Sequence, residues 1–203
     1  MEKSKFLIII LGPTGVGKTE LSVFLARKYD ADIFSADARQ FFKELNIGTA
    51  KPSKEALANV KHHFIDSLSI HACYNVGKFE GAVIQKLDSY FQQKDIAILV
   101  GGSGLYINAV CEGIDPMPDI DKNIRAGLNK THKENGIKPL LEQLEKLDPA
   151  YYREVDRSNP QRIIRALEVC IATGESFSAL RTHSKKRRNF IPIKIGLNIA
   201  RAV

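Results

Sequence analysis

The chain has 203 residues, of which 44% are hydrophobic and 26% are charged, as expected of a globular protein large enough for one α/β domain and a smaller appendage. Because no apolar run approaches the roughly 20 residues needed to cross a bilayer and the N-terminus has no signal-peptide pattern, we expect a cytoplasmic protein with no membrane partner. Residues 1–120 carry 13 lysines and arginines against 14 acidic residues, whereas residues 121–203 carry 17 against 9.

The strongly basic second part fits either a segment that grips a polyanion or an ordinary solvated surface, and charge alone does not separate the two. The three cysteines, Cys73, Cys111 and Cys170, are odd in number and too widely spaced for a zinc knuckle. We therefore interpret them as reduced, mostly structural thiols.

The first half of the chain predicts alternating strands and helices. Residues 7–11 are a continuous apolar run rich in isoleucine, typical of a buried parallel strand. A glycine-rich turn follows, and the pattern over 19–29 predicts a helix with Leu21, Phe24 and Leu25 on its buried face. The later predicted elements are short strands over 33–36 and 62–66, an amphipathic helix over 75–93 and a buried strand over 96–100. This alternation predicts a doubly wound parallel α/β sheet.

The character of the sequence changes near residues 115–118. From there to about residue 188 the pattern is helical and polar, and a last strand is predicted over 193–197. We therefore predict an α/β core formed by residues 1–114 and 191–203, with a helical insertion over 115–190.

A phosphate-binding motif follows the first predicted strand. The octapeptide there matches G-x-x-x-x-G-K-[ST] and opens a predicted helix. Its glycines let backbone N–H groups face an anion at the positive end of the helix. Lys18 supplies a charge to the terminal phosphate, and Thr19 offers a hydroxyl ligand to Mg²⁺. The predicted diphosphate-binding residues of this P-loop are Gly12, Pro13, Thr14, Gly15, Val16, Gly17, Lys18 and Thr19.

The P-loop alone does not identify the reaction, because NTPases, small-molecule kinases and some transferases all bind di- or triphosphates with it. A conventional ATPase also needs an acidic Mg²⁺ ligand at the end of a later apolar strand. The best such strand, over 96–100, runs into Gly101-Gly102 without a carboxylate. This weakens the NTPase interpretation.

Further blocks of sequence resemble the tRNA dimethylallyltransferase (tRNA isopentenyltransferase) family. They occur in the family's order and together cover nearly the whole chain, so the ensemble is much more specific than any single block. The blocks are Asp37-Ala38-Arg39-Gln40, Ile47-Gly48-Thr49-Ala50-Lys51-Pro52, His62-His63-Phe64-Ile65-Asp66, Gly101-Gly102-Ser103-Gly104-Leu105-Tyr106 and the NPQRIIRALE segment over 159–168. The resemblance implies transfer of a dimethylallyl group from its diphosphate to N6 of the adenosine beside a tRNA anticodon.

The resemblance also implies roles around the P-loop. Thr14 and Arg201 match positions that contact the diphosphate, and Lys18 with Thr19-bound Mg²⁺ would take up the charge of the leaving group. Asp37 matches the general base that accepts the proton of the attacking amine. Taken alone, an aspartate after a strand is more often a turn or helix cap.

Other positions match the family's tRNA contacts, so the resemblance makes residues 115–190 a tRNA-binding insertion. Within the NPQRIIRALE segment, Ile163 and Ile164 belong to the matched block but are expected to point toward packing. For Arg162 and Arg165 the alternative is an ordinary solvated helix face. The matched tRNA-binding positions are Asp37, Ala38, Arg39, Gln40, Ser103, Arg125, Gln161, Arg162, Ile163, Ile164 and Arg165.

Two further groups of side chains are expected to be less specific. His62 and His63 would face opposite ways on a strand, so hydrogen bonding is preferred to a shared metal site. The basic segment over 185–188 fits either a phosphate contact or a solvated loop.

The chain departs from the family pattern in three places. Ala38 replaces the usual serine, Ser103 replaces a threonine, and family members continue through a helical C-terminal segment that is expected to be missing here. The alternatives are an adenylate isopentenyltransferase acting on free nucleotide, a P-loop small-molecule kinase that uses ATP, and an inactive RNA-binding remnant. The expected partners are the tRNA anticodon arm and dimethylallyl diphosphate, with Mg²⁺ as cofactor and the protein acting as a monomer.

Overall fold

A computed structural model describes residues 4–182 and 184–199 of the chain. The chain divides into two compact units, of which one comprises Met1–Ile114 with Lys185–Val203 and the other Asp115–Ser184. The second unit therefore ends six residues before the predicted boundary at 190. In the described part of the chain, no helix is both long and apolar enough to span a bilayer.

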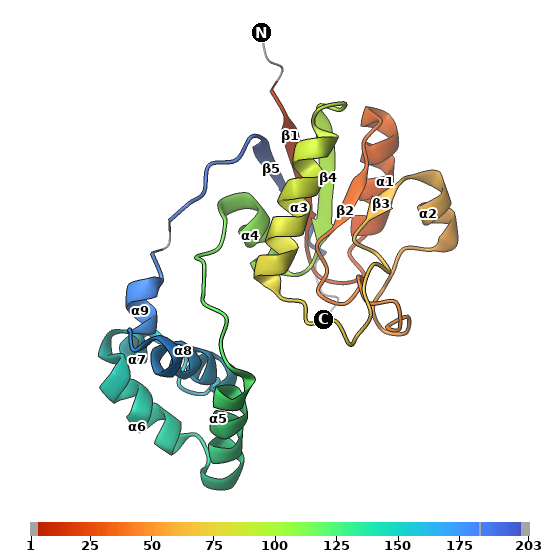
Figure 1. Cartoon of the computed structure of the whole chain (residues 1–203). Coiled ribbons are helices and arrows are strands. Elements are labelled where there is room, and N and C mark those ends of the chain that lie inside the picture. The colour runs from red at the N-terminus through yellow and green to blue at the C-terminus, as the bar shows by residue number, and fades with distance from the viewer. Residues whose placement is uncertain (1–3, 183, 200–203) are drawn as a thin grey trace. The chain divides into compact units, whose positions relative to one another are not determined.

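The described residues of the first unit form a five-stranded sheet in the order β3-β2-β4-β1-β5, and every neighbouring pair is parallel (Figure 1). The strands are β1 (Phe6–Leu11), β2 (Ile33–Ser35), β3 (His62–His63), β4 (Ile96–Gly101) and β5 (Ile191–Gly196). The helices between them are α1 (Lys18–Tyr29), α2 (Lys54–Asn59), α3 (Val76–Tyr90) and α4 (Gly104–Glu112). The predicted parallel α/β fold is confirmed.

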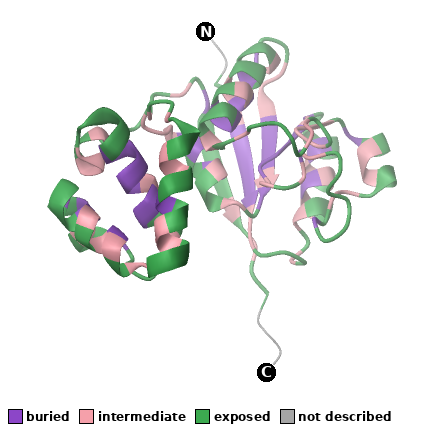
Figure 2. Ribbon diagram, turned by 60° about the horizontal axis from the view of Figure 1, so that its bottom comes forward, coloured by how far each residue is buried: buried purple, intermediate pink, exposed green. Residues whose placement is uncertain are grey.

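The alternation of side chains along the strands builds a core on each face of the sheet. On one face Leu7 and Ile9 of β1 pack with Phe79 of α3 and with side chains of α4. On the other face Ile8 and Ile10 pack with the apolar residues of α1. Successive strand residues point to opposite faces, so the continuous apolar run of β1, buried throughout its centre (Figure 2), feeds both cores.

Helix α1 buries only part of the predicted apolar face. Phe24 is 60% exposed, whereas Ser22 and Ala26 are buried. Leu21 and Leu25 are half-buried against the core on this side of the sheet. The small side chains allow α1 to lie close to the strands, and Phe24 falls outside that contact.

Gly101 brings the carboxyl ends of β2 and β4 together. A Cβ atom added there would lie 2.3 Å from the carbonyl oxygen of Ala36, a distance that requires the backbone to shift. Only glycine permits this approach, which places Asp37, directly after Ala36, beside the Gly101-Gly102 turn. Ligands of open parallel sheets bind at this carboxyl edge.

The second unit is helical throughout its described residues. Its helices are α5 (Lys122–Asn135), α6 (Lys138–Leu147), α7 (Pro149–Glu154), α8 (Pro160–Thr173) and α9 (Phe177–Leu180). Leu128, Leu140 and Leu144 pack against the buried face of α8. The side chain of Asn159 accepts a hydrogen bond from the Arg162 N–H at the start of α8, where proline occupies the first turn.

A buried aspartate fixes the end of this helical unit. Asp148 is 1% exposed and accepts hydrogen bonds from the Tyr151 N–H at 2.9 Å and from the Ser178 N–H and hydroxyl, each at 2.7 Å. One carboxylate thus caps α7 and holds α9, and these hydrogen bonds offset the cost of burying its charge.

The basic segment over 185–188 belongs to the first unit and is held by acidic side chains of that unit. Lys186 Nζ and Arg188 Nη2 bind the buried carboxylate of Glu80 at 3.1 and 2.7 Å. Lys185 pairs with Glu112 at 3.4 Å, and Phe190 packs in the core. These contacts explain why the helical unit ends before residue 185, and they give Lys186 and Arg188 a structural role.

Candidate functional site

The P-loop connects β1 to α1 and adopts backbone angles that favour glycine. Gly15 and Gly17 have φ of 82° and 90°, in the left-handed region, and Gly17 is the N-cap residue directly before helix α1. Gly12 is required for a different reason, since a Cβ there would lie 2.4 Å from the carbonyl oxygen of Leu197. The loop therefore has the geometry of an anion cradle at a helix N-terminus.

Lys18 turns back over this loop. Its ammonium group donates hydrogen bonds to the carbonyl oxygens of Gly12 at 2.8 Å and Pro13 at 2.6 Å. Partial burial lowers the pKa of Lys18, and the opposing charge of Asp37 acts in the other direction.

A cleft of about 900 Å³ joins the P-loop to the carboxyl ends of β2 and β4. It is lined by residues 14–19 of the P-loop, by the predicted block 37–40, by Ser103, and by residues 48–50. Most of the predicted site therefore converges on one cavity. Gly12 and Pro13 instead line a smaller cavity of about 350 Å³, although their carbonyl groups hold Lys18.

Asp37 lies in a tight turn inside the cleft. Its Oδ1 accepts a hydrogen bond from the Arg39 N–H at 2.9 Å, and among the described residues no donor is seen for Oδ2. The Ala38 N–H donates to the Ser103 hydroxyl at 3.2 Å. The turn is thus tied to the β4 side of the cleft, and one carboxylate oxygen is left to meet a ligand.

Gln40 closes the opposite wall of the cleft. Its Oε1 accepts a hydrogen bond from the Ser35 hydroxyl at 2.9 Å, and its Nε2 donates to the carbonyl oxygens of Thr49 and Ala50 at 3.2 and 3.0 Å. The sequence assigned no site role to Ser35, Thr49 or Ala50. The only available signal was that Thr49 and Ala50 lie in a family-like block.

The two adjacent histidines are separately satisfied, as predicted. His62 lines the cleft with Nδ1 2.8 Å from the Val60 carbonyl oxygen, whereas His63 Nε2 lies 2.7 Å from Asp32 Oδ2 and its ring packs on Phe34. Burial lowers the pKa of both imidazoles. Across the described ranges, no three His, Cys, Asp or Glu side chains gather as a metal cluster would require.

The predicted tRNA-binding residues of the helical unit meet on neighbouring helices. Arg125 of α5 donates to Gln161 of α8 at 3.0 Å, and both Arg125 and Arg165 pair at 3.4 Å with the buried Glu168. Arg162 lies exposed in the first turn of the same helix. The result is a surface on which two arginines share one buried carboxylate, and one of them also binds the Gln161 amide.

Two residues of the matched block do not reach this surface. Ile163 and Ile164 are fully buried in the core of the helical unit, so their side chains hold α8 in place and cannot contact RNA. Arg201, the other predicted diphosphate contact, lies outside the described residues.

A glycine-shaped anion cradle at the carboxyl edge of a parallel sheet, opened by a strand and closed by a helix, defines a P-loop α/β protein. Within that class, the IPP transferase family model matches residues 40–203. The chain belongs to this family.

Known relatives extend beyond the length of this chain. It is 51% identical to a tRNA dimethylallyltransferase of Christiangramia forsetii over 96% of the chain and 64% of the relative, and 46% identical to one of Flavobacterium johnsoniae over 98% and 66%. The chain thus spans about two thirds of the length of these curated relatives.

The chain is also similar to parts of longer solved structures. The full-length tRNA isopentenylpyrophosphate transferase of Bacillus halodurans is 34% identical, with a TM-score of 0.53 over 86% of this chain and 57% of that one. A eukaryotic dimethylallyltransferase acting on tRNA is 23% identical, with a TM-score of 0.74 over 96% and 48%. The second likeness supports the fold.

Proposed function

We propose that the protein transfers a dimethylallyl group from dimethylallyl diphosphate to N6 of the adenosine adjacent to the anticodon in tRNA. The observation that carries the proposal is that Asp37 and the P-loop lysine line the same cleft. A carboxylate and an anion cradle facing one cavity suit a reaction in which one group takes a proton while the other receives a leaving diphosphate.

The reaction makes and breaks one bond at the same carbon. The C–O bond between the dimethylallyl group and diphosphate breaks, its electron pair leaving with the diphosphate, and a C–N bond forms to N6. P-loop N–H groups and Lys18 stabilise the developing negative charge. Asp37 accepts a proton from N6, because the nitrogen would otherwise carry a positive charge once the C–N bond has formed.

The cleft also fits Mg²⁺ as a partner of the diphosphate. Mg²⁺ is usually held by one or two protein oxygens together with waters and substrate phosphates, and the Thr19 hydroxyl and the Asp37 carboxylate both lie on the cleft wall. When bound, the metal would neutralise charge on the leaving group. Thr19 is the residue that we assign to hold it.

The helical unit would supply the tRNA-binding surface. The target adenine has to leave its stack to reach a cavity, so the anticodon arm must be gripped elsewhere. Arg125, Gln161, Arg162 and Arg165 present that surface. Of the segment 115–190 predicted from the sequence, we therefore propose the helical unit, residues 115–184, as the tRNA-binding part. We also propose a monomer as the active form.

One assay separates this function from its rivals. Purified protein receives dimethylallyl diphosphate and Mg²⁺ with either tRNA or AMP, and in parallel ATP with small-molecule acceptors. Prenylated tRNA, detected by mass spectrometry of its nucleosides, is the expected product. Prenylated AMP would indicate a free-nucleotide enzyme, a phosphorylated acceptor would indicate a kinase, and tRNA binding without product would indicate an RNA-binding remnant.

The Arg165→Ala variant is expected to bind tRNA more weakly and with a shallower salt dependence. Removing one phosphate contact should reduce the slope of log K against log salt by about one. Filter binding across a salt series measures it. Arg125 remains beside Glu168, so the carboxylate keeps a partner.

Lys130→Ala is the matched control for this change. Lys130 is an exposed cation on α5 with a 4.0 Å pairing to Glu134, away from the Arg125 cluster in sequence. The slope of log K against log salt for tRNA binding by Lys130→Ala should equal that of the unmodified protein. Equal slopes for Lys130→Ala and Arg165→Ala would contradict the proposed contact.

A further inference from the structure

We propose that Lys51 is a positioning residue that holds the acceptor wall of the cleft, formed by residues 37–52, in the shape that receives the adenine. The inference rests on the proposed function, since it assigns this wall to the acceptor and the P-loop to the diphosphate.

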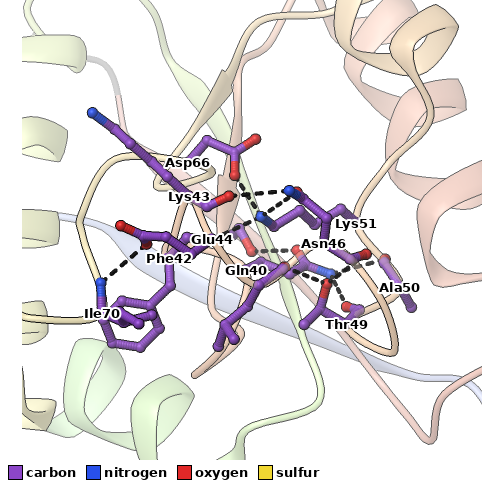
Figure 3. A network of polar contacts seen from close by, with 12 residues as sticks. Gln40, Phe42, Lys43, Glu44, Asn46, Thr49, Ala50, Lys51, Asp66 and Ile70 are labelled. Atoms are coloured by element: carbon purple, nitrogen blue, oxygen red, sulfur yellow. Dashed lines mark hydrogen bonds and ion pairs between the residues drawn. The ribbon is translucent and has the colours of Figure 1, made fainter.

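Lys51 is the centre of a polar network behind the cleft (Figure 3). Its Nζ donates hydrogen bonds to the Phe42 carbonyl oxygen at 2.8 Å, to Asn46 Oδ1 at 3.0 Å and to Asp66 Oδ1 at 2.5 Å. An ammonium group has three donors, and all three are used here. The Lys51 side chain is only 10% exposed, whereas its partner Asp66 is 46% exposed, so the ammonium group is buried and the carboxylate reaches the surface.

The three acceptors lie outside the sheet, on segments whose regular pairing is one isolated parallel bridge between Phe42 and Leu68 with its flanking backbone hydrogen bonds. Residues 40–50 form turns, and the backbone pairs with residues 66–68 through the Asp66 N–H to Gln40 and the Lys43 N–H to Leu68. Ala50 and Asp66 both have positive φ, of 47° and 49°. Such angles cost non-glycine residues energy and persist only where surrounding contacts enforce them.

Lys51 connects this network to the cleft through its neighbour. Ala50 and Pro52, on either side of Lys51, line the cleft. The Ala50 carbonyl oxygen accepts a hydrogen bond from Gln40, which in turn is held by Ser35 at the end of β2. The ammonium group therefore sets the position of Ala50 and, through Gln40, the block that begins with Asp37.

The network reaches only one side of the cleft. No bond of Lys51 among the described residues involves the P-loop, whose lysine is held by Gly12 and Pro13. Loss of Lys51 should thus alter acceptor recognition and leave diphosphate binding unchanged. A general loss of folding would change both.

Lys51→Met tests this assignment because it keeps most of the aliphatic stem and removes the charge. We expect kcat/KM for tRNA to fall by about 10- to 100-fold, the range that a small misplacement of reacting groups produces, with the affinity for inorganic pyrophosphate within twofold of the unmodified protein. Amide exchange of residues 43–50 should become faster. The control is Lys54→Met, which removes an exposed cation three residues away at the start of α2.

Chemical rescue provides a second measurement. In a Cys73→Ser background, which removes the exposed thiol, Lys51→Cys is alkylated with 2-bromoethylamine to restore an ammonium group at nearly the same place. Recovery of the tRNA kcat/KM and of slow exchange at 43–50 supports the positioning role, and alkylation without recovery overturns it.

The other outcomes also decide the matter. Transfer and amide exchange in Lys51→Met equal to those of the unmodified protein would overturn the inference, as would an equal loss of pyrophosphate and tRNA affinity. Failure of the unmodified protein to prenylate tRNA would instead remove the proposed function. In that case, weaker tRNA binding and faster amide exchange of residues 43–50 in Lys51→Met would still support the role of Lys51 in holding the acceptor wall. Unchanged tRNA binding and amide exchange would refute that role.

Discussion

Replacing Asp37 by asparagine is expected to lower the rate of prenyl transfer to tRNA by about 10²- to 10⁴-fold, the usual contribution of a positioned general base. The amide cannot accept the N6 proton at a useful rate, so the attacking amine becomes cationic in the transition state. Asparagine retains an oxygen at Oδ1 that can still accept the Arg39 N–H, so the turn should survive. Single-turnover kinetics with saturating tRNA measures the loss.

Two controls separate catalysis from binding in this variant. tRNA affinity and pyrophosphate affinity should stay within a few-fold of the unmodified values, because the contacts assigned to the P-loop and the helical unit remain. Asp30→Asn changes an exposed carboxylate that pairs with Lys94, outside the cleft, and should transfer at the unmodified rate. Full activity in Asp37→Asn would remove Asp37 from the role of base.

The sheet and the P-loop were predictable because their signals are local. The isoleucine run of β1 and the glycines at 12, 15 and 17 each dictate a conformation within a few residues. Parallel strands bring their carboxyl ends to one edge, so the placement of Asp37 near the P-loop followed from the topology alone. The bounds of the three central strands, β2, β4 and β1, each differ from the prediction by one residue at one end.

The acceptor wall was not predictable in the same way. The contacts among Lys51, Gln40 and Asp66 form only after the segments 40–51 and 66–68 fold against each other. No periodic pattern in the sequence predicts these contacts. The same applies to the surface of the helical unit, where Arg125 and Gln161 are 36 residues apart. The blocks that resemble the family include most of these residues, but they do not predict which residues contact one another.

The basic segment over 185–188 has contacts that the sequence could not assign. Its sequence fits a phosphate contact or a solvated loop, and the structure adds an ion pair between Arg188, which is 10% exposed, and Glu80, 108 residues earlier. A cluster of cations indicates an acidic partner, and the sequence does not say whether that partner is a ligand or a buried carboxylate of the same chain.

Glu80→Ala is expected to lower the free energy of unfolding by about 3–5 kcal/mol, the usual cost of breaking a buried ion pair by removing one partner. Glu80 is 7% exposed and is bound by both Arg188 and Lys186. Truncation leaves the Arg188 guanidinium with only the Ala109 carbonyl oxygen among these partners. Urea denaturation followed by circular dichroism measures the change.

Glu112→Ala is the matched control, because Glu112 also meets two lysines, Lys185 and Lys194, but is 42% exposed. Screening by water makes such pairs worth about 0–1 kcal/mol. Equal free energies of unfolding for Glu80→Ala and Glu112→Ala would contradict the idea that burial gives the Glu80 ion pair its larger contribution.

The double replacement Glu80→Met with Arg188→Met should recover much of the stability lost in Glu80→Ala, since apolar side chains can substitute for a buried ion pair when both buried charges are removed. The remaining cation, Lys186, is 45% exposed and keeps its contact with water. The result also bears on the site. Arg188 precedes β5, and the Leu197 N–H that follows this strand donates to Leu11 beside the P-loop. Loss of the ion pair should therefore weaken pyrophosphate binding by Glu80→Ala at urea concentrations near its unfolding midpoint. The double variant should restore the pyrophosphate affinity under the same conditions. An unrestored affinity in a stable double variant would show that the P-loop does not depend on this anchor.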